Sequence, residues 1–192
     1  SHLNVRRAQI ASWPDLLAGL DEVAANPALC KTVVVDTADW AEQLCTAFVL
    51  TKFRQPSIEA FGYGKGYTYL QEEFAKLLSS AGKVISAGIH VCLVAHAKMR
   101  KQELPDEMGA FDRWEMKLSR QVAPLVKEWA DALLFLNYKT YVQKTEAGAH
   151  KASGGRRVIY TSHHPCWDAK NRHGLAPELE LSYESIAPIF NA

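Results

Sequence analysis

Apolar positions along the chain fall into two patterns, helical spacing and short unbroken runs, which together predict an α/β protein. The first helix is predicted to begin at Ser12, because this residue can cap it and Pro14 fits the first helical turn. Leucine and valine side chains then recur at helical spacing until Asn26-Pro27 ends the helix. A strand is expected before it, over Leu3–Ile10.

Two apolar runs without alternation predict buried strands of a parallel sheet. They cover Lys31–Asp36, which reads KTVVVD, and Ile89–Ala95. Between them lie two predicted helices, one over 38–53 and one from Tyr67 onward. A strand, helices and a second strand make a right-handed parallel crossover. The predicted fold class is therefore α/β, with a mostly parallel sheet covered by helices on both faces.

Smaller elements are predicted in the rest of the chain. They are a polar loop over 97–109, a helix over 118–129, strands over 133–138 and 157–161 with a polar connection over 145–155 between them, and a short helix over 183–189. The two strands that flank the connection are expected to pair as a hairpin at the edge of the sheet.

Composition is that of an ordinary globular domain, predicted to span residues 1–192, with 48% hydrophobic and 22% charged residues. The 22 Lys and Arg residues nearly balance the 21 Asp and Glu residues, so any contact with DNA has to come from a local patch. Three cysteines, Cys30, Cys45 and Cys92, lie in apolar stretches, which predicts reduced, buried thiols of a cytoplasmic protein. No apolar run approaches the roughly 18 residues of a membrane span.

The run KTVVVD ends on Asp36, and a hydrophobic strand that ends on an acid is the Walker B pattern. A carboxylate at the carboxyl end of a parallel strand can orient Mg²⁺ and its waters beside the phosphates of a nucleotide. The Thr37 hydroxyl could hydrogen-bond the same water shell. The alternative is a buried strand followed by an acid that caps the next helix.

His96 directly follows the second apolar run and is expected to lie close to Asp36 at the same edge of the sheet. In P-loop ATPases a polar residue at this position senses the γ-phosphate. The alternative is a histidine that ends a strand and binds no ligand.

The stretch FGYGKGYT, from Phe61 to Thr68, has the glycines and the lysine of a phosphate-binding loop but not their spacing. The pattern G-x-x-x-x-G-K-[ST] is not met, because Gly66 follows Lys65, and no strand directly precedes the stretch. It is interpreted as a loop that leads into a helix. DNA contact through Tyr63, Lys65 and Tyr67 is one role for it, and a solvated glycine turn is the alternative.

Basic side chains gather in and after the predicted loop that follows His96. They are Lys98, Arg100, Lys101, Arg113 and Lys117. Such cations suit phosphate contacts from a loop over the carboxyl edge of the sheet. Acidic residues interrupt them, so a solvated loop is the alternative.

Two further clusters carry reactive residue types. His163 and His164 precede Asp168, and a metal-dependent hydrolase with these three side chains on one ion is a further hypothesis. No second ligand pair lies at zinc spacing, so a zinc site is not expected here. Lys170 and Arg172 lie one residue apart and project in the same general direction if the segment is extended. That layout suits an arginine finger reaching the nucleotide of a neighbouring subunit, and a basic surface turn is the alternative.

Several stretches together resemble the RecA-like (RadA-like) P-loop ATP-binding proteins of phages and prophages, within a wider group of recombination and single-strand annealing ATPases. They are TVVVDTADW, FGYGKGYTYL, HVCLVAHAKMRK, GAFDRWEMKL, EWADALLF, GGRRVIYTSHHPCWDAKNR and GLAPELELSYESI. The resemblance covers nearly the whole chain from about Val5, and the order and number of the stretches make it specific.

The resemblance implies a RecA-type fold in which Asp36 is the Walker B acid and His96 is the polar residue that ends the next strand. Lys170-Asn171-Arg172 is similar to the KNR element of RadA-type proteins and to the Lys-x-Arg pair of hexameric helicases, which acts on the nucleotide of the neighbouring subunit. It further implies ATP and Mg²⁺ as cofactors, single-stranded DNA as partner, self-association into rings or filaments, and the cytoplasm of a bacterial host cell.

The sequence departs from this family in the elements that bind the phosphates of ATP. In the family the first strand, the phosphate loop and the second strand precede the position of Leu3, and they have no counterpart in these residues. Without the N–H groups and lysine of that loop, ATP binding is expected to be weak or absent. Two hypotheses follow: the core of a DNA recombination or annealing ATPase, and a nucleotide-independent DNA-binding or assembly module with vestigial ATPase features.

Overall fold

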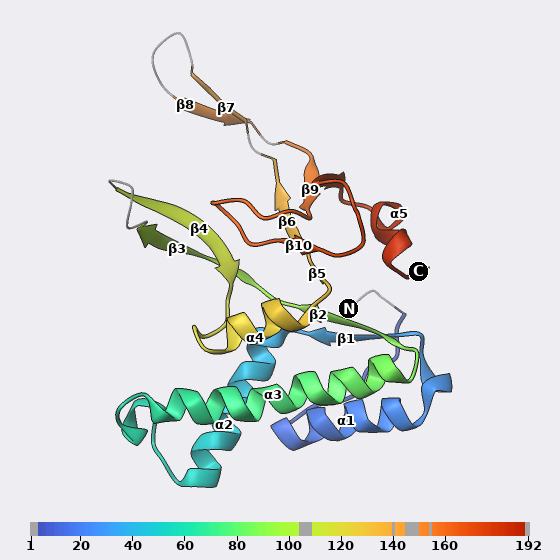
Figure 1. Ribbon diagram of the computed structural model, residues 1–192, viewed down its shortest axis with the longest axis vertical. Helices are drawn as coiled ribbons and strands as arrows, with labels where there is room; N and C mark the ends of the chain where they lie inside the picture. The colour runs from blue at the N-terminus through green and yellow to red at the C-terminus, as the bar shows by residue number, and fades with distance from the viewer. Residues whose placement is uncertain (1–3, 104–108, 140, 145–149, 154, 191–192) are drawn as a thin grey trace. The chain divides into compact units, whose positions relative to one another are not determined.

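The computed structural model describes residues 4–103, 109–139, 141–144, 150–153 and 155–190 (Figure 1). They group into two units, the first made of Ser1–His96 and Met116–Val126 and the second of Ala97–Glu115 and Lys127–Ala192. The expectation of a single domain over residues 1–192 stays a prediction.

The first helix, α1 (Trp13–Ala25), begins where the sequence predicts it. The Ser12 hydroxyl accepts a hydrogen bond from the Asp15 amide at 3.3 Å, and Asn26 ends the helix before the 3-10 helix η1 (Pro27–Leu29). The strand predicted over Leu3–Ile10 is wrong, because residues 4–10 have no regular structure. Residues 4–9 are all exposed, so this segment has no buried face to hold it against a sheet.

Both predicted strands are present, as β1 (Thr32–Asp36) and β2 (His90–Val94), and they pair in parallel as predicted. The prediction that they are buried is wrong except at Val35. Asp36 lies opposite Val94, so the carboxyl ends of the two strands meet at one edge. The crossover between them consists of α2 (Ala38–Phe53), the 3-10 helix η2 (Glu59–Phe61) and α3 (Lys65–Ser86).

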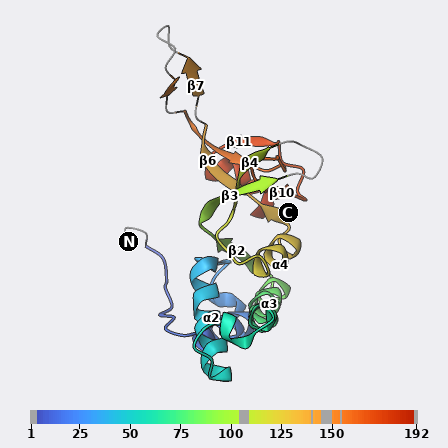
Figure 2. The same ribbon diagram turned by 90° about the vertical axis from the view of Figure 1, so that its left-hand side faces the viewer.

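Three helices pack together in the first unit. α1 and α2 both contact α3, and Figures 1 and 2 show α2 and α3 side by side. Trp13 stacks on Phe74 with ring centroids 5.9 Å apart, and its Nε1 donates a hydrogen bond of 3.1 Å to the buried Glu73. Other fully buried side chains of this core are Cys45, Val49, Leu77 and Val84.

The β1–β2 sheet buries only one of its faces within the described part of the first unit. Val35 is 7% exposed, whereas Val34 and Val94, on the other face, are 56% and 41% exposed. The predicted helical layer on the second face is therefore not seen among the described residues.

The second unit is built from small sheets. β6 (Phe135–Tyr138), β9 (Arg157–Tyr160) and β11 (Glu178–Glu180) form a three-stranded antiparallel sheet, β5 (Ala132–Leu133) pairs antiparallel with β10 (Lys170–Asn171), and β7 (Tyr141–Lys144) pairs antiparallel with β8 (His150–Ser153). The predicted pairing of the strands near 133–138 and 157–161 is confirmed as β6–β9. The prediction of one mostly parallel sheet is wrong for the described strands, because they separate into several short sheets.

A strand lies over much of the loop predicted over 97–109, so that prediction is wrong for residues 97–103, whereas residues 104–108 lie outside the described residues. β3 (Ala97–Glu103) pairs with β4 (Ala110–Met116), and exposed and half-buried residues alternate along β3. Gln102 donates a hydrogen bond of 2.6 Å to Glu115 between them. Long polar side chains make this pair, which is why no apolar pattern revealed it. The polar connection predicted over 145–155 contains β8, and its residues 145–149 and 154 lie outside the described residues.

The remaining helices are shorter than predicted. α4 (Val122–Trp129) begins after Ser119, whose hydroxyl accepts a hydrogen bond from the Val122 amide at 3.2 Å. Pro124 falls in the first turn of α4, where a missing N–H costs little. The predicted closing helix is present as α5 (Tyr183–Ile186), followed by the 3-10 helix η3 (Ala187–Phe190).

The four cysteines are free thiols, but only Cys45 is buried. Cys92 is exposed and Cys30 is half-buried, so the prediction that all three thiols are buried is wrong for these two. They lie in apolar stretches whose outer positions are not covered in the first unit. A search of the described helices found none with the length and apolar character that crossing a bilayer requires.

Candidate functional site

Asp36 and His96 follow the same edge of the β1–β2 sheet. Asp36 is the last residue of β1, and His96 lies two residues beyond Val94, the last residue of β2 and the register partner of Asp36. Both side chains are exposed, and that of His96 is 59% exposed. The structure therefore brings the two predicted residues to the carboxyl ends of adjacent parallel strands, where α/β proteins bind their ligands.

Thr37 caps the N-terminus of α2. It is the N-cap residue, 8% exposed, and its hydroxyl oxygen accepts a hydrogen bond of 3.5 Å from the Trp40 amide. The cap fixes the direction in which α2 leaves the sheet directly after Asp36. A contact between Thr37 and the water shell of Mg²⁺ stays a prediction.

Asp39, in the first turn of α2, holds His96 in place. The Asp39 side chain is only 3% exposed, and its Oδ2 lies 2.9 Å from His96 Nδ1. Its Oδ1 lies 3.2 Å from the same ring nitrogen and accepts a hydrogen bond of 3.2 Å from the His96 amide. Burial acts to raise the pKa of Asp39, but hydrogen bonds from the His96 ring, the His96 amide and Thr37 hold that pKa below its ordinary value.

The residues at this edge fit Mg²⁺ through a single carboxylate. Mg²⁺ in nucleotide sites keeps several waters and takes one or two carboxylates from the protein, together with phosphate oxygens. Asp36 supplies an exposed carboxylate for such a shell. Asp39 does not, because its two oxygens are engaged with His96.

In the glycine-rich stretch FGYGKGYT, residues 62–64 form a turn between two helices, and residues 65–68 belong to α3. Phe61 ends η2 and Lys65 begins α3, so no strand leads into the stretch. A methyl group at Gly66 would meet the Ile58 carbonyl oxygen and the Phe61 ring, so this glycine allows the start of α3 to pack closely against residues 58–61. The structure therefore agrees with its interpretation as a loop that leads into a helix and not as a phosphate-binding loop.

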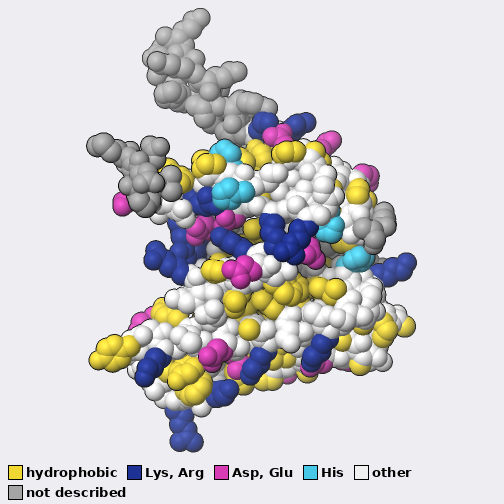
Figure 3. All heavy atoms as spheres, in the orientation of Figure 1, with side chains coloured by type: hydrophobic (Ala, Val, Ile, Leu, Met, Phe, Trp, Pro, Cys, Tyr) yellow, Lys and Arg dark blue, Asp and Glu magenta, His cyan; other side chains and the backbone are white. Residues whose placement is uncertain are grey.

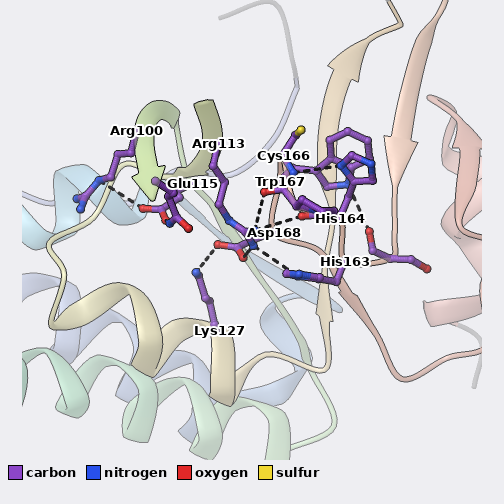
Figure 4. Close-up of polar contacts among 12 residues, drawn as sticks. Arg100, Arg113, Glu115, Lys127, His163, His164, Cys166, Trp167 and Asp168 are labelled. Carbon is purple, nitrogen blue, oxygen red and sulfur yellow. Dashed lines mark hydrogen bonds and ion pairs between the residues drawn. The ribbon is translucent and has the colours of Figure 1, made fainter. Parts of the chain in front are cut away.

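A buried ion cluster in the second unit contains Arg113, one of the predicted phosphate contacts (Figure 4). The Asp168 carboxylate forms ion pairs with Arg113 and Lys127, and its side chain is 13% exposed. Arg113 also donates to the Pro165 carbonyl at 2.7 Å and lies 3.4 Å from the His163 ring nitrogen. Its guanidinium therefore ties β4 to the segment 163–168 instead of facing solvent.

His164 belongs to an aromatic stack. Its ring lies on Trp167 with centroids 4.0 Å apart, and Trp167 in turn stacks on Tyr160 at 4.2 Å. The metal hypothesis requires His163, His164 and Asp168 to converge on one ion, and among the described residues no such group of three ligands is found. The carboxylate it needs is already paired with two cations.

Lys170 and Arg172, the predicted pair acting on a neighbouring subunit, both have partners in the second unit. Lys170 Nζ donates to the Lys127 and Glu128 carbonyl oxygens at the end of α4, at 2.8 and 3.1 Å. Arg172 forms an exposed ion pair of 2.7 Å with Asp131. Lys170 thus caps a helix, whereas the guanidinium of Arg172 is held by an ion pair that solvent weakens.

The other predicted phosphate contacts differ in exposure. Lys65, Lys101 and Lys117 are exposed, whereas Lys98 is half-buried. Arg100 lies 3.3 Å from the Glu115 carboxylate across the β3–β4 pair. The three exposed lysines are therefore the better placed of this set to meet a polyanion.

A parallel strand pair joined by a helical crossover, with an acid ending one strand and a histidine after the next, is an α/β arrangement that fits a P-loop NTPase. The chain belongs to the family described as AAA domain, which matches residues 1–173. That family generally uses ATP and Mg²⁺. No curated protein and no solved structure matches the chain.

Proposed function

We propose that the chain is the core of a phage-type RecA-like ATPase that couples ATP hydrolysis to DNA recombination or single-strand annealing in a bacterial cytoplasm. The observation that carries the proposal is the placement of Asp36 and His96 at the carboxyl ends of adjacent parallel strands. Asp36 would hold the water shell of Mg²⁺, and His96 would sense the terminal phosphate. Bound Mg²⁺ supplies charge neutralisation of the phosphates.

ATP binding by these 192 residues alone is expected to be weak, because they contain no G-x-x-x-x-G-K-[ST] pattern. The N–H groups and lysine of such a loop form the main cradle for the β- and γ-phosphates. A version extended upstream by a strand and a phosphate loop should therefore bind Mg²⁺–ATP where the 192-residue chain does not.

Replacing Asp36 with Asn should lower Mg²⁺-dependent phosphate release by the extended version about tenfold or more, because the amide cannot neutralise charge in the Mg²⁺ shell. The measurement is labelled-ATP titration followed by steady-state phosphate release. Asp21→Asn is the matched control, since Asp21 is an exposed acid paired with Lys83 at 2.9 Å outside the site. If neither the chain nor its extended version binds ATP, the ATPase proposal is wrong.

Single-stranded DNA is the proposed partner, and the turn between α2 and α3 supports it. Tyr63 is fully exposed with a left-handed φ of 48°, and Lys65 next to it is also exposed. The Tyr67 hydroxyl donates a hydrogen bond of 2.9 Å to Glu59 and so holds the turn from behind. Figure 3 shows Lys and Arg side chains beside hydrophobic ones over this turn, at the lower left. Exposed rings beside cations suit stacked bases and their phosphates.

The double change Tyr63→Ala and Lys65→Gln should weaken binding of an unstructured oligonucleotide about tenfold, through loss of one stacking contact and one phosphate contact. Gel shifts over a range of salt concentrations measure this, with and without ATP. Lys83→Gln is the control, because Lys83 lies on the same helix but is paired with Asp21. Equal binding by all three proteins would exclude the turn as the DNA contact. If ATP does not change oligonucleotide binding even in the extended version, the result would favour the nucleotide-independent module.

The proposal also includes self-association into a ring or filament on DNA. Arg172 would act across the boundary between copies, and its exposed pair with Asp131 is weak enough to exchange for a phosphate. Lys170 would then support Arg172 from its position against α4.

A further inference from the structure

An unusual pairing of burial and exposure marks Asp39 and His96. The Asp39 side chain is 3% exposed, yet it binds an imidazole whose side chain is 59% exposed. A carboxylate is placed inside a protein only where hydrogen bonds satisfy it, and His96 provides two of them through its ring and its amide. The pair therefore connects a buried carboxylate on α2 to an exposed imidazole at the carboxyl edge of the sheet.

The main chain of His96 is fixed on both sides. Its amide donates to Asp39 Oδ1 at 3.2 Å, and its carbonyl oxygen accepts a hydrogen bond of 2.7 Å from the Lys117 amide. With the ring also bound to Asp39, little rotational freedom remains for the imidazole. The position of the ring relative to β1 and α2 is thus set by contacts and not by solvent.

The contact decides which ring nitrogen carries the proton. Since its pKa lies below the ordinary value of an aspartate, Asp39 is ionised at neutral pH and can only accept hydrogen bonds. His96 Nδ1, at 2.9 Å, must then be the donor. In the neutral ring Nε2 consequently carries no proton and acts as an acceptor, which suits it to take a proton from water and not to donate one to a phosphate.

We propose that Asp39 is a positioning residue that holds His96 in the Nδ1-protonated tautomer, so that Nε2 serves as general base for the attacking water. This role rests on the proposed function. The water oxygen bonds to the γ-phosphorus as the bond from that phosphorus to the β–γ bridging oxygen breaks, and ADP departs with the bridging electrons. The water proton passes to Nε2, and the resulting imidazolium faces the Asp39 carboxylate until it returns the proton to solvent.

The first test reads the tautomer directly and needs no nucleotide. Long-range ¹⁵N–¹H correlation spectra of the 192-residue chain, recorded above the titration of its histidines, should show the His96 ring protonated on Nδ1. In Asp39→Asn the amide can donate to Nδ1, so the ring should shift toward the Nε2-protonated form. Glu42→Gln is the matched control on the same helix, since the Glu42 carboxylate accepts a hydrogen bond of 3.0 Å from the Ser119 amide and not from His96. A wild-type ring protonated on Nε2, or no change in Asp39→Asn, overturns the proposal.

The second test asks whether the tautomer matters for turnover, using the extended version of the chain. Asp39→Asn should lower kcat about tenfold with little change in KM for ATP, whereas Glu42→Gln should leave both unchanged. A shifted tautomer with unchanged kcat overturns the positioning role alone. No turnover by the unmutated protein overturns the proposed function together with the general-base role, and the tautomer spectra then still report whether Asp39 controls the ring.

Discussion

Replacing Asp168 with Ala should destabilise the second unit by about 3 kcal/mol. The substitution leaves two cations, Arg113 and Lys127, without the carboxylate that neutralises them. The Arg113 side chain is only 10% exposed, so water cannot replace the lost partner without local opening. Removing the carboxylate costs more than its ion pairs contribute, because Arg113 stays buried and charged.

Amide hydrogen exchange at Val158 and Ile159 measures this effect, since both side chains are fully buried in the central strand of the second unit. Asp131→Ala is the matched control, because Asp131 pairs with Arg172 at the surface with both side chains more than half exposed. The control should change stability by less than about 0.5 kcal/mol. If the two substitutions have the same effect, the buried cluster contributes no more than a surface pair.

The Asp168 carboxylate also makes the stability of the second unit depend on pH in the acid range. Burial acts to raise the pKa of Asp168, but Lys127 and Arg113 hold it below its ordinary value. A group whose pKa is depressed in the folded state stabilises the fold above its unfolded pKa of about 3.9, and this contribution is lost as pH falls through the folded pKa. The wild type should therefore lose stability below about pH 4 more steeply than Asp168→Ala does.

Sequence reasoning placed Asp36 and His96 correctly because it needed only one geometric rule. Two unbroken apolar runs predict parallel strands, and parallel strands end at the same edge. The residues that follow such runs must then be neighbours, whatever the rest of the chain does. The register confirms this, with Asp36 opposite Val94 and His96 two residues further on.

Asp39 was missed because nothing local marks it as more than an acid in a first helical turn. Its role depends on burial and on a partner 57 residues away in sequence. The available signal was position: an acid one turn into the helix that leaves the sheet edge points back toward that edge. The same dependence on distant contacts hid the role of Lys170, which caps α4 at carbonyls 42 and 43 residues away.

The β3–β4 strand pair was missed for a different reason, which lies in its polar sequence. Its strands consist largely of charged and amide side chains, and the alternation that exists is between exposed and half-buried positions. A hydrophobic pattern cannot detect such strands, because the side chains that shield them are themselves polar. Polarity was therefore interpreted as a loop, and Arg100, which pairs with Glu115 across the two strands, was interpreted as a phosphate contact.

Two glycines of α3, Gly66 and Gly82, should respond to the same substitution in opposite ways. Alanine is favoured over glycine in a helix by about 1 kcal/mol, so Gly82→Ala should stabilise the first unit by about 0.5–1 kcal/mol. Apart from the adjoining residues and the backbone of its own helix, no atom lies within 4 Å of the position its methyl group would take.

At Gly66 the methyl group would press against the Ile58 carbonyl oxygen and lie 2.8 Å from the Phe61 ring. Because a backbone oxygen cannot move aside as a flexible side chain does, η2 and the start of α3 must separate. Gly66→Ala should therefore destabilise the first unit by about 2 kcal/mol despite the helical preference of alanine. Urea unfolding followed by circular dichroism measures both variants.

The same separation would displace the turn that presents Tyr63 and Lys65. Gly66→Ala should thus weaken binding of single-stranded DNA under conditions where the protein is still folded, and Gly82→Ala should not. A stable Gly66→Ala variant with unchanged unfolding would mean that the turn tolerates a wider spacing. Full DNA binding by a destabilised Gly66→Ala variant would mean that the close packing of this glycine serves the helices alone and not the presentation of the turn.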